Sequence, residues 1–253
     1  MKYKIVERNQ HGRDFVLGDL HGNYSYLKKF LQKVGFHQET DRLFLVGDLI
    51  DRGPESEKCL QLLLEPWVFA VPGNHEYMFL QMVHNDFTYL GLKDYWEESN
   101  GGVWTKKWFE RNAPELKFWA SVISELPFVI EVQGDDQRKP FWVVHAELWS
   151  PRMAVNHQNV QTLVETSDEK QINIFQWSRF IAKHRTSGKA VALPGPIYCG
   201  HTPTPQPGKT VSGHVNLDAG AGVGVFKEKL KITRPRLCLC LHNTNELFFQ
   251  DIE

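Results

Sequence analysis

Three short apolar runs, each soon followed by a glycine and a polar loop, limit most strongly how this chain can fold. The runs are 15–17, 43–46 and 68–71, and the loops are Gly18-Asp19-Leu20-His21-Gly22, Gly47-Asp48-Leu49-Ile50-Asp51-Arg52-Gly53 and Gly73-Asn74-His75-Glu76. Such a run predicts a buried strand, and the carboxyl ends of parallel strands meet at one edge of a sheet. Asp, His and Asn side chains gathered at one edge predict a hydrolytic site with two metal ions.

The rhythm of the chain changes from its first half to its second. Helical spacing of apolar residues over 26–34 predicts a helix that Gly35 ends. Later apolar runs predict a hairpin of 127–132 with 141–144, a short helix at 176–186, and strands near 196–199, 214–217, 236–241 and 246–250. Strand–helix units followed by a strand-rich half predict an α/β sandwich of two sheets with outer helices. We expect a single domain over 1–253, with a helical, aromatic insert near 85–125.

The composition excludes several classes of partner. The formal charge is −1 and the isoelectric point about 6.8, so no surface for nucleic acid is expected. No segment is apolar enough to span a membrane, and residues 1–8 lack a leader's apolar stretch. The four cysteines (Cys59, Cys199, Cys238 and Cys240) include no C-x-x-C pair, which predicts buried free thiols and a reducing, cytoplasmic location. The oligomeric state stays open.

The three loops also resemble a known family. The order GD-x-HG, GD-x-x-DRG and GNHE is similar to the phosphoprotein phosphatase branch of the metallophosphoesterases, and closest to the bacteriophage lambda-type serine/threonine protein phosphatases. The similarity extends over roughly residues 14–250 and includes Pro66–Val71, Asn100-Gly101-Gly102, Trp177-Ser178-Arg179 and Cys199-Gly200-His201-Thr202-Pro203. It implies a calcineurin-like sandwich of two mixed sheets flanked by helices.

Six residues are candidate metal ligands. Asp19 and His21 share a tight loop, Asp48 has two oxygens that can bridge two ions, and Asn74 offers a neutral oxygen. His145 and His201 each follow a predicted strand. The resemblance implies that Asp19, His21 and Asp48 hold one metal and that Asp48, Asn74, His145 and His201 hold the other. This mixture of carboxylate and imidazole suits manganese first, with iron or zinc as alternatives.

Two such ions predict a reaction. They lower the pKa of a bridging water and polarise a phosphoryl group, so hydroxide attacks phosphorus directly without a phosphoenzyme. Asp51 and His75 resemble the family's proton-handling pair, in which the carboxylate keeps the imidazole protonated for the leaving group. Arg52 suits bidentate phosphate contact, and Arg179 matches a second phosphate-binding arginine of the lambda-type enzymes.

One position departs from the family pattern. Pro72 stands where the lambda-type enzymes have an arginine, directly before GNHE. Relatives that hydrolyse dinucleoside tetraphosphates also lack that arginine. The motifs as a whole still predict a phosphomonoesterase acting on phosphoserine and phosphothreonine in proteins or on a small phosphoester. A diadenosine tetraphosphate hydrolase is the first alternative, and a non-catalytic phosphate-binding scaffold is an alternative of another class.

Several other residues carry weaker signals. Trp104 and Trp108 are expected to pack a helical subdomain, with stacking on a ligand as the alternative. Asn100-Gly101-Gly102 fits either a segment beside the cleft or a helix-start turn, and Gly220 with Gly222 predicts a tight turn lining the cleft. The remaining histidines are expected at the surface or in turns: His11, His37, His84, His157, His184, His214 and His242.

Overall fold

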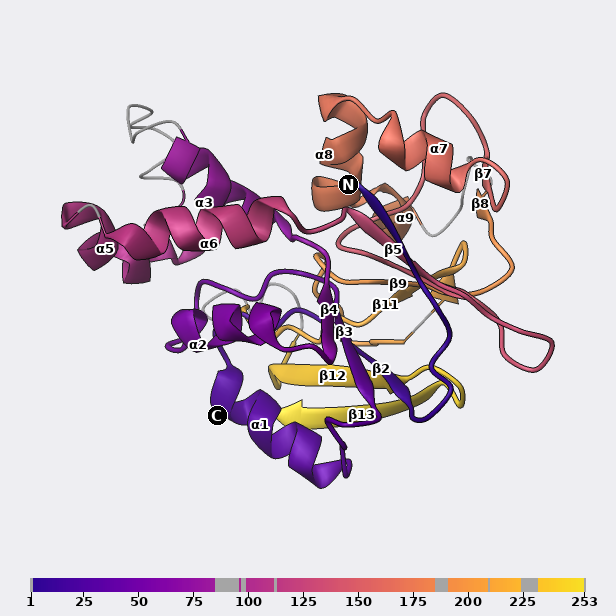
Figure 1. Cartoon of the computed structure of the whole chain (residues 1–253), viewed down its shortest axis with the longest axis horizontal. Coiled ribbons are helices and arrows are strands. Elements are labelled where there is room, and N and C mark those ends of the chain that lie inside the picture. Colours follow the sequence, from indigo (N-terminus) through magenta and orange to yellow (C-terminus); the bar gives the residue numbers. More distant parts are fainter. Residues whose placement is uncertain are drawn as a thin grey trace.

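The fold of the chain was obtained as a computed structural model, and it is a four-layer sandwich in which two central sheets are covered by helices on their outer faces (Figure 1). The structure describes residues 2–84, 96, 99–111, 113–184, 191–208, 210–223 and 232–252. The predicted α/β sandwich of two mixed sheets is confirmed.

The first sheet has five strands in the order β13-β12-β2-β3-β4. β2 (Asp14–Leu17), β3 (Arg42–Leu45) and β4 (Val68–Ala70) are parallel neighbours, and β12 (Arg236–Leu241) and β13 (Glu246–Asp251) join antiparallel. The helices between the parallel strands are α1 (Tyr24–Lys33) and α2 (Ser56–Gln61), which continues into the 3₁₀ helix η1 (Leu62–Leu64). All three predicted N-terminal strands are therefore present.

The second sheet has six strands in the order β1-β5-β6-β9-β11-β10. The bounds are β1 (Tyr3–Val6), β5 (Val129–Val132), β6 (Phe141–Val144), β9 (Ile197–Cys199), β10 (Thr210–Val211) and β11 (His214–Asn216). β5 and β6 form the predicted hairpin, whereas β6, β9 and β11 are parallel neighbours. Each sheet thus contains three adjacent parallel strands.

Helices and a small third sheet cover the outer face of the six-stranded sheet. They are α7 (Val160–Glu165), α8 (Glu169–Trp177), α9 (Phe180–His184), β7 (Val155–Asn156) and β8 (Val191–Ala192). Over 176–184 the expected helix is the end of α8 and all of α9, separated at Ser178–Arg179; residues 185 and 186 lie outside the described residues. That break matters below because Arg179 lies in it.

The described residues between β4 and β5 form the helical arm at the left of Figure 1. It contains α3 (Asn74–His84), the 3₁₀ helix η2 (Gly102–Thr105), α5 (Lys106–Glu110) and α6 (Pro114–Ser124). The part of the predicted insert 85–125 that the structure describes is helical from 99 onward; 85–95, 97, 98 and 112 lie outside the described residues. Whether the chain is one domain stays a prediction.

Alternating side chains of the central strands build two of the three cores. Phe15, Leu17 and Leu45 pack toward α1, α2 and α3, whereas Val16 and Phe44 pack between the sheets. A third core lies between the six-stranded sheet and its helices. Strands buried on both faces are apolar throughout, which is why they were visible in the sequence.

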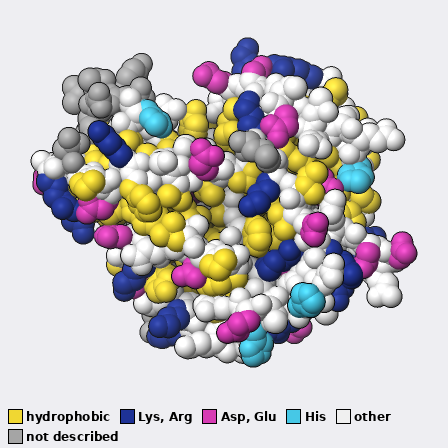
Figure 2. Space-filling model, viewed as in Figure 1, with side chains coloured by type: hydrophobic (Ala, Val, Ile, Leu, Met, Phe, Trp, Pro, Cys, Tyr) yellow, Lys and Arg dark blue, Asp and Glu magenta, His cyan; other side chains and the backbone are white. Residues whose placement is uncertain are grey.

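The surface and the thiols agree with the composition. Basic and acidic side chains are interspersed on the face shown in Figure 2. None of the helices in the described part of the chain has the length and apolar character that a bilayer crossing requires. All four cysteines are buried and free, as predicted.

One of the histidine predictions was wrong: His214 is a buried residue of strand β11. His214 and His242 are buried, with 4% and 8% of their surface exposed. His214 begins β11, whereas His242 lies in the turn after β12, where the sequence placed it, and each ring has backbone or hydroxyl partners. His11, His37, His84 and His157 are exposed, and the side chain of His184 lies outside the described residues.

Candidate active site

The site lies where the three parallel strands of one sheet face the three parallel strands of the other. Every strand end in question is followed by a buried polar side chain. From the five-stranded sheet, β2 delivers Asp19 and His21, β3 delivers Asp48 and β4 delivers Asn74; from the six-stranded sheet, β6 delivers His145, β9 delivers His201 and β11 delivers Asp218. All six predicted ligand residues are therefore brought together, from two different sheets.

A glycine allows the two sheets to approach this closely. A Cβ atom on Gly200 would lie 1.8 Å from Asp19 Oδ1 and 2.9 Å from Val46 Cγ2. No other residue fits there. The next residue, His201, donates its backbone N–H to both Asp19 oxygens, at 3.2 and 3.1 Å. The loop after β9 is thus tied directly to the loop after β2.

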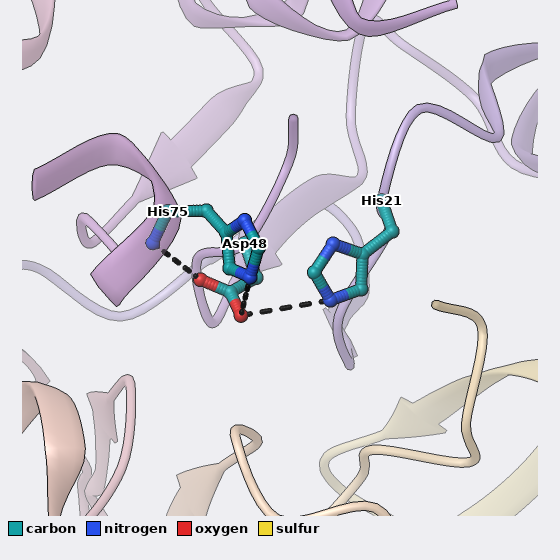
Figure 3. Close-up of side chains that lie close together, drawn as sticks. All are labelled: His21, Asp48 and His75. Carbon is teal, nitrogen blue, oxygen red and sulfur yellow. Dashed lines mark hydrogen bonds and ion pairs between the residues drawn. The ribbon is translucent and has the colours of Figure 1, made fainter. Parts of the chain in front are cut away.

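Asp48 is at the centre of the cluster. Its Oδ2 lies 3.6 Å from His21 Nε2, and its Oδ1 lies 3.4 Å from His145 Nε2. Figure 3 shows His21 and His75 on two sides of the Asp48 carboxylate, which also accepts the backbone N–H of His75 at 3.1 Å. Two groups of potential donors, each within 4.8 Å, share this residue: His21, Asp48 and His75, and Asp48, His145 and His201.

The orientation of the imidazoles fits a cation. His145 Nδ1 donates to the carbonyl oxygen of Val46 at 2.8 Å, so its Nε2 carries a free electron pair. That nitrogen lies 3.0 Å from Asn74 Oδ1, which also lies 2.8 Å from His201 Nδ1. His21 Nδ1 similarly donates to Ile50 O at 3.0 Å. Electron pairs of buried imidazole, amide and carboxylate groups converge here, and a divalent cation would stabilise that arrangement.

Burial sets the charges of the cluster. It lowers the pKa values of His21, His145 and His201, which therefore stay neutral, as ligation requires. Burial alone would raise the pKa of Asp48, but the surrounding imidazoles outweigh it and hold that pKa well below its usual range. Burial and neighbouring carboxylates raise the pKa values of Asp19 and, to about 6, of Asp218. The clustered negative charge favours a cation.

Asp51 and His75 form a buried pair beside the cluster. His75 Nδ1 lies 2.6 Å from Asp51 Oδ2, and neither side chain has any exposed surface. Burial lowers the pKa of His75, but Asp48 and Asp51 outweigh that effect, so the pKa is raised overall. The Asp51 carboxylate also accepts the indole N–H groups of Trp96 and Trp104, each at 2.6 Å.

Two arginines lie at the mouth of the site. Arg52 places Nη1 3.0 Å from His21 Nε2 and Nη2 3.0 Å from His75 Nε2. Arg179 contacts the other donor group, donating Nε–H to His201 Nε2 at 3.2 Å. Both side chains are exposed. The two predicted phosphate-binding arginines therefore contact different donor groups of the cluster, and an anion could reach both.

A buried carboxylate anchors the turn that carries Arg179. Glu147 Oε2 accepts from the Ser178 hydroxyl and from the N–H of Phe180 at 3.1 Å, and Oε1 accepts the N–H of Ala182 at 3.0 Å. Glu147 is 3% exposed. The break between α8 and α9 is thus held on both sides of Arg179.

Strained backbone is concentrated at these loops. Of the seven non-glycine residues with positive φ in the described chain, five belong to the site: His21, Asp48, Asp51, Arg52 and His201. Such conformations are costly and persist where the surroundings enforce them. Their side chains are aimed by the loops rather than by regular structure.

Sequence reasoning missed three site residues: Asp218, Glu147 and Trp96. Asp218 had a usable signal, because it follows β11 as Asp19 follows β2, but no second ligand-type residue accompanies it. Glu147 and Trp96 act through contacts distant in sequence and had no local signal. The turn of Gly220–Gly222 lies against the site, since a Cβ on Gly222 would lie 2.2 Å from His21 Cδ2 and 2.8 Å from Arg52 Cδ.

The sequence profile described as calcineurin-like phosphoesterase matches residues 15–231. The chain belongs to this family. The match includes every residue of the site described above. The similarity to the phosphatase branch is also borne out, because serine/threonine protein phosphatases are among the similar proteins.

Among those relatives is "Serine/threonine-protein phosphatase 1" of Salmonella typhimurium (strain LT2), 37% identical over 131 residues, or 52% of this chain and 58% of that protein. Another is the symmetrical bis(5'-nucleosyl)-tetraphosphatase of Wigglesworthia glossinidia brevipalpis, 29% identical over 169 residues, or 64% and 56%. The chain thus spans less than two thirds of the length of these two relatives.

A solved serine/threonine phosphatase from Saccharomyces cerevisiae, described as similar to human phosphatase PP5, shares the fold. The TM-score is 0.63 over 100% of this chain and 84% of the other, at 14% sequence identity. At that identity the likeness establishes the fold alone.

Proposed function

We propose that this calcineurin-like phosphoesterase hydrolyses phosphomonoesters, with phosphoserine and phosphothreonine of proteins as its main substrates. The observation that carries the proposal is the position of Asp48, which is shared by two donor groups and lies beside the Asp51–His75 pair. One carboxylate between two clusters suits a pair of divalent ions. The relative from Salmonella typhimurium supports the choice of substrate.

The metal set follows the expectation from sequence. Asp19, His21 and Asp48 would hold one ion, with Asp19 in place of the His75 of the first donor group because His75 is paired with Asp51. Asp48, Asn74, His145 and His201 would hold the other. Manganese is the first choice for this mixed oxygen and nitrogen donor set, with iron or zinc possible. When bound, the two ions would supply positive charge to the phosphoryl oxygens and lower the pKa of water.

The chain's own residues would bind the substrate and handle its protons. Arg52 and Arg179 would each pair with phosphoryl oxygens from one side of the cleft. His75 would donate the proton on Nε2 to the leaving oxygen, since its Nδ1 is engaged by Asp51. Arg52 Nη2 lies 3.0 Å from His75 Nε2, so the two groups face the same space. Because a guanidinium can only donate, Arg52 would have to turn to the phosphoryl oxygens before Nε2 could carry the proton.

A dinucleoside polyphosphate hydrolase is the second candidate. Pro72, in place of an arginine, and the relative from Wigglesworthia glossinidia brevipalpis favour it. A non-catalytic scaffold is disfavoured by the complete donor set. The four free thiols support a reducing compartment, and we retain the cytoplasm as the proposed location.

An assay on metal-free protein reloaded with Mn²⁺ separates these functions. A phosphoserine peptide, p-nitrophenyl phosphate and diadenosine tetraphosphate are supplied in parallel, with Asp48→Asn as the metal-site control. We expect turnover of the peptide and the aryl ester, and loss of most metal and nearly all turnover in the control. Preference for the dinucleotide would establish the second candidate. No turnover of any of the three substrates would favour the non-catalytic scaffold.

A further inference from the structure

Two tryptophan side chains donate hydrogen bonds to the carboxylate of Asp51. Trp96 Nε1 donates to Oδ2 and Trp104 Nε1 donates to Oδ1, both at 2.6 Å. With His75 Nδ1 at 2.6 Å from Oδ2, three donors surround a carboxylate that has no exposed surface. The backbone N–H of Asp51 is held as well, by the Ser56 hydroxyl at 2.9 Å.

The two indoles belong to one packed aromatic cluster. Phe79, on α3, meets Trp96 edge-on at 6.0 Å and stacks on Trp104 at 6.5 Å. The same helix begins at Asn74 and carries His75 in its first turn. Gly102 allows the close fit, because a Cβ there would lie 2.4 Å from Cε2 of Trp96. The helical arm therefore packs directly against the loop 47–53, which carries Asp51.

An indole N–H can only donate, which determines what the Asp51 carboxylate can do. With one indole on each oxygen, the carboxylate cannot rotate and cannot offer a proton to either tryptophan. His75 Nδ1 must then be the donor to Oδ2. The imidazole plane is fixed, and Nε2 points toward Arg52 and the cleft. Buried hydrogen-bond networks in which every member is satisfied hold their groups rigidly.

We propose that Trp96 and Trp104 are positioning residues for proton transfer by His75, and that the helical arm acts in the reaction through Asp51. The role rests on the proposed phosphoesterase function. Aromatic packing alone is the competing explanation, and the same cluster supplies a control. Trp108 is buried and meets Trp104 edge-on at 5.1 Å, but its ring packs within the arm.

The test compares Trp104→Phe and Trp96→Phe with Trp108→Phe in the Mn²⁺-loaded protein. Each change removes one indole, but only the first two remove a donor from Asp51. We expect kcat on an alkyl phosphate to fall roughly tenfold, with unchanged KM and metal content, as part of the 10²–10⁴-fold that general acid catalysis supplies. The loss on p-nitrophenyl phosphate should be smaller, and Trp108→Phe should behave like the wild type. Trp104 is only half-buried, so its variant remains informative if Trp96→Phe does not fold.

A double variant separates positioning from packing. In a His75→Asn background, Trp104→Phe should cause no further loss of kcat, because the indole acts only through that imidazole. A metal-free readout accompanies it: the indole ¹H resonances of Trp96 and Trp104 should lie downfield and shift in Asp51→Asn, while that of Trp108 stays in place.

The outcomes are distinct. An inactive wild-type protein would contradict the proposed function, and with it any reaction for the tryptophans to support. An active wild type with equal losses in all three tryptophan variants, or with additive losses in the double variant, would overturn the positioning role alone.

Discussion

Glu76 and Asp48 are joined through the backbone: the Glu76 carboxylate oxygen Oε2 accepts the N–H of Asp48 at 2.8 Å. The same oxygen accepts the N–H of Gly73 at 2.8 Å, and Oε1 accepts that of Leu49 at 2.8 Å. One buried carboxylate therefore fixes the loop after β3 and the loop after β4 relative to each other. Burial and Asp48 raise its pKa to about 7, against the backbone donors that favour the ionised form.

Replacing that carboxylate by an amide should loosen both loops. In Glu76→Gln an NH₂ group replaces one oxygen, so at least one backbone donor loses its acceptor. Each buried donor left without a partner costs about 1–3 kcal/mol. We expect the free energy of unfolding of the metal-free protein to fall by at least about 1 kcal/mol, measured in urea. The exposed Glu57→Gln is the control; an equal effect there would contradict the proposed tie.

The Asp51–His75 pair predicts a dependence on the leaving group. His75→Asn should lower kcat on an alkyl phosphate by roughly 10²–10⁴-fold, the range of general acid catalysis. The loss should be smaller on p-nitrophenyl phosphate, whose leaving group needs little protonation. Metal content, measured by elemental analysis, should stay normal. Equal losses on both esters would point to another role for His75.

The Glu147 carboxylate predicts an effect on substrate binding. Glu147→Gln leaves the donors around Ser178–Phe180 short of an acceptor, so the turn should no longer hold Arg179 in place. A charge-assisted phosphate contact is worth about 1.5–3 kcal/mol, so kcat/KM for a small monoester should fall at least roughly tenfold, mainly through KM. In an Arg179→Ala background the same change should add little. Additive losses would mean that Glu147 acts elsewhere.

His214 predicts a loss of stability in acid. Its Nε2 accepts the N–H of Leu148 at 2.9 Å, and burial lowers its pKa from 6.5 to about 4. Below pH 6.5 the unfolded chain therefore binds a proton that the folded chain refuses, and stability falls until about pH 4. The loss is at most about 3 kcal/mol, at 1.36 kcal/mol per pKa unit.

Denaturant unfolding of the metal-free protein between pH 7 and pH 4 measures this loss. His214→Gln keeps an acceptor for Leu148 without a titrating group, so its stability should fall less steeply with acid. The exposed His11→Gln should follow the wild type. Identical slopes for all three proteins would exclude His214 as a source of the acid dependence.

The features visible in the sequence were those encoded locally. A strand buried on both faces is an apolar run, and Asp19, His21, Asp48 and Asn74 follow such runs within a few residues. His145 and His201 obey the same rule in the other sheet. Their roles as ligands stay a prediction, but their meeting at one place followed from the strand ends alone.

What stayed hidden depends on contacts between distant residues. The bond from Trp104 to Asp51 spans 53 positions and that from Glu147 to the Phe180 N–H spans 33, and no local pattern marks either pair. His214 and His242 are buried because of where β11 and β12 lie in their sheets. The local sequence around these histidines does not show those positions. Asp218 follows a strand end too, but its loop contains no second ligand-type residue that would have marked it.

The contribution of both sheets to one cluster has a consequence for how the protein matures. Synthesis proceeds from the amino terminus, and early segments fold before later ones emerge. Asp19, His21, Asp48 and Asn74 leave the ribosome more than a hundred residues before His201. An incomplete donor set holds a divalent ion weakly, and metal affinity appears only as the binding geometry forms. With the proposed ligand set, metal loading therefore follows the synthesis of His201, when segments of both sheets are present.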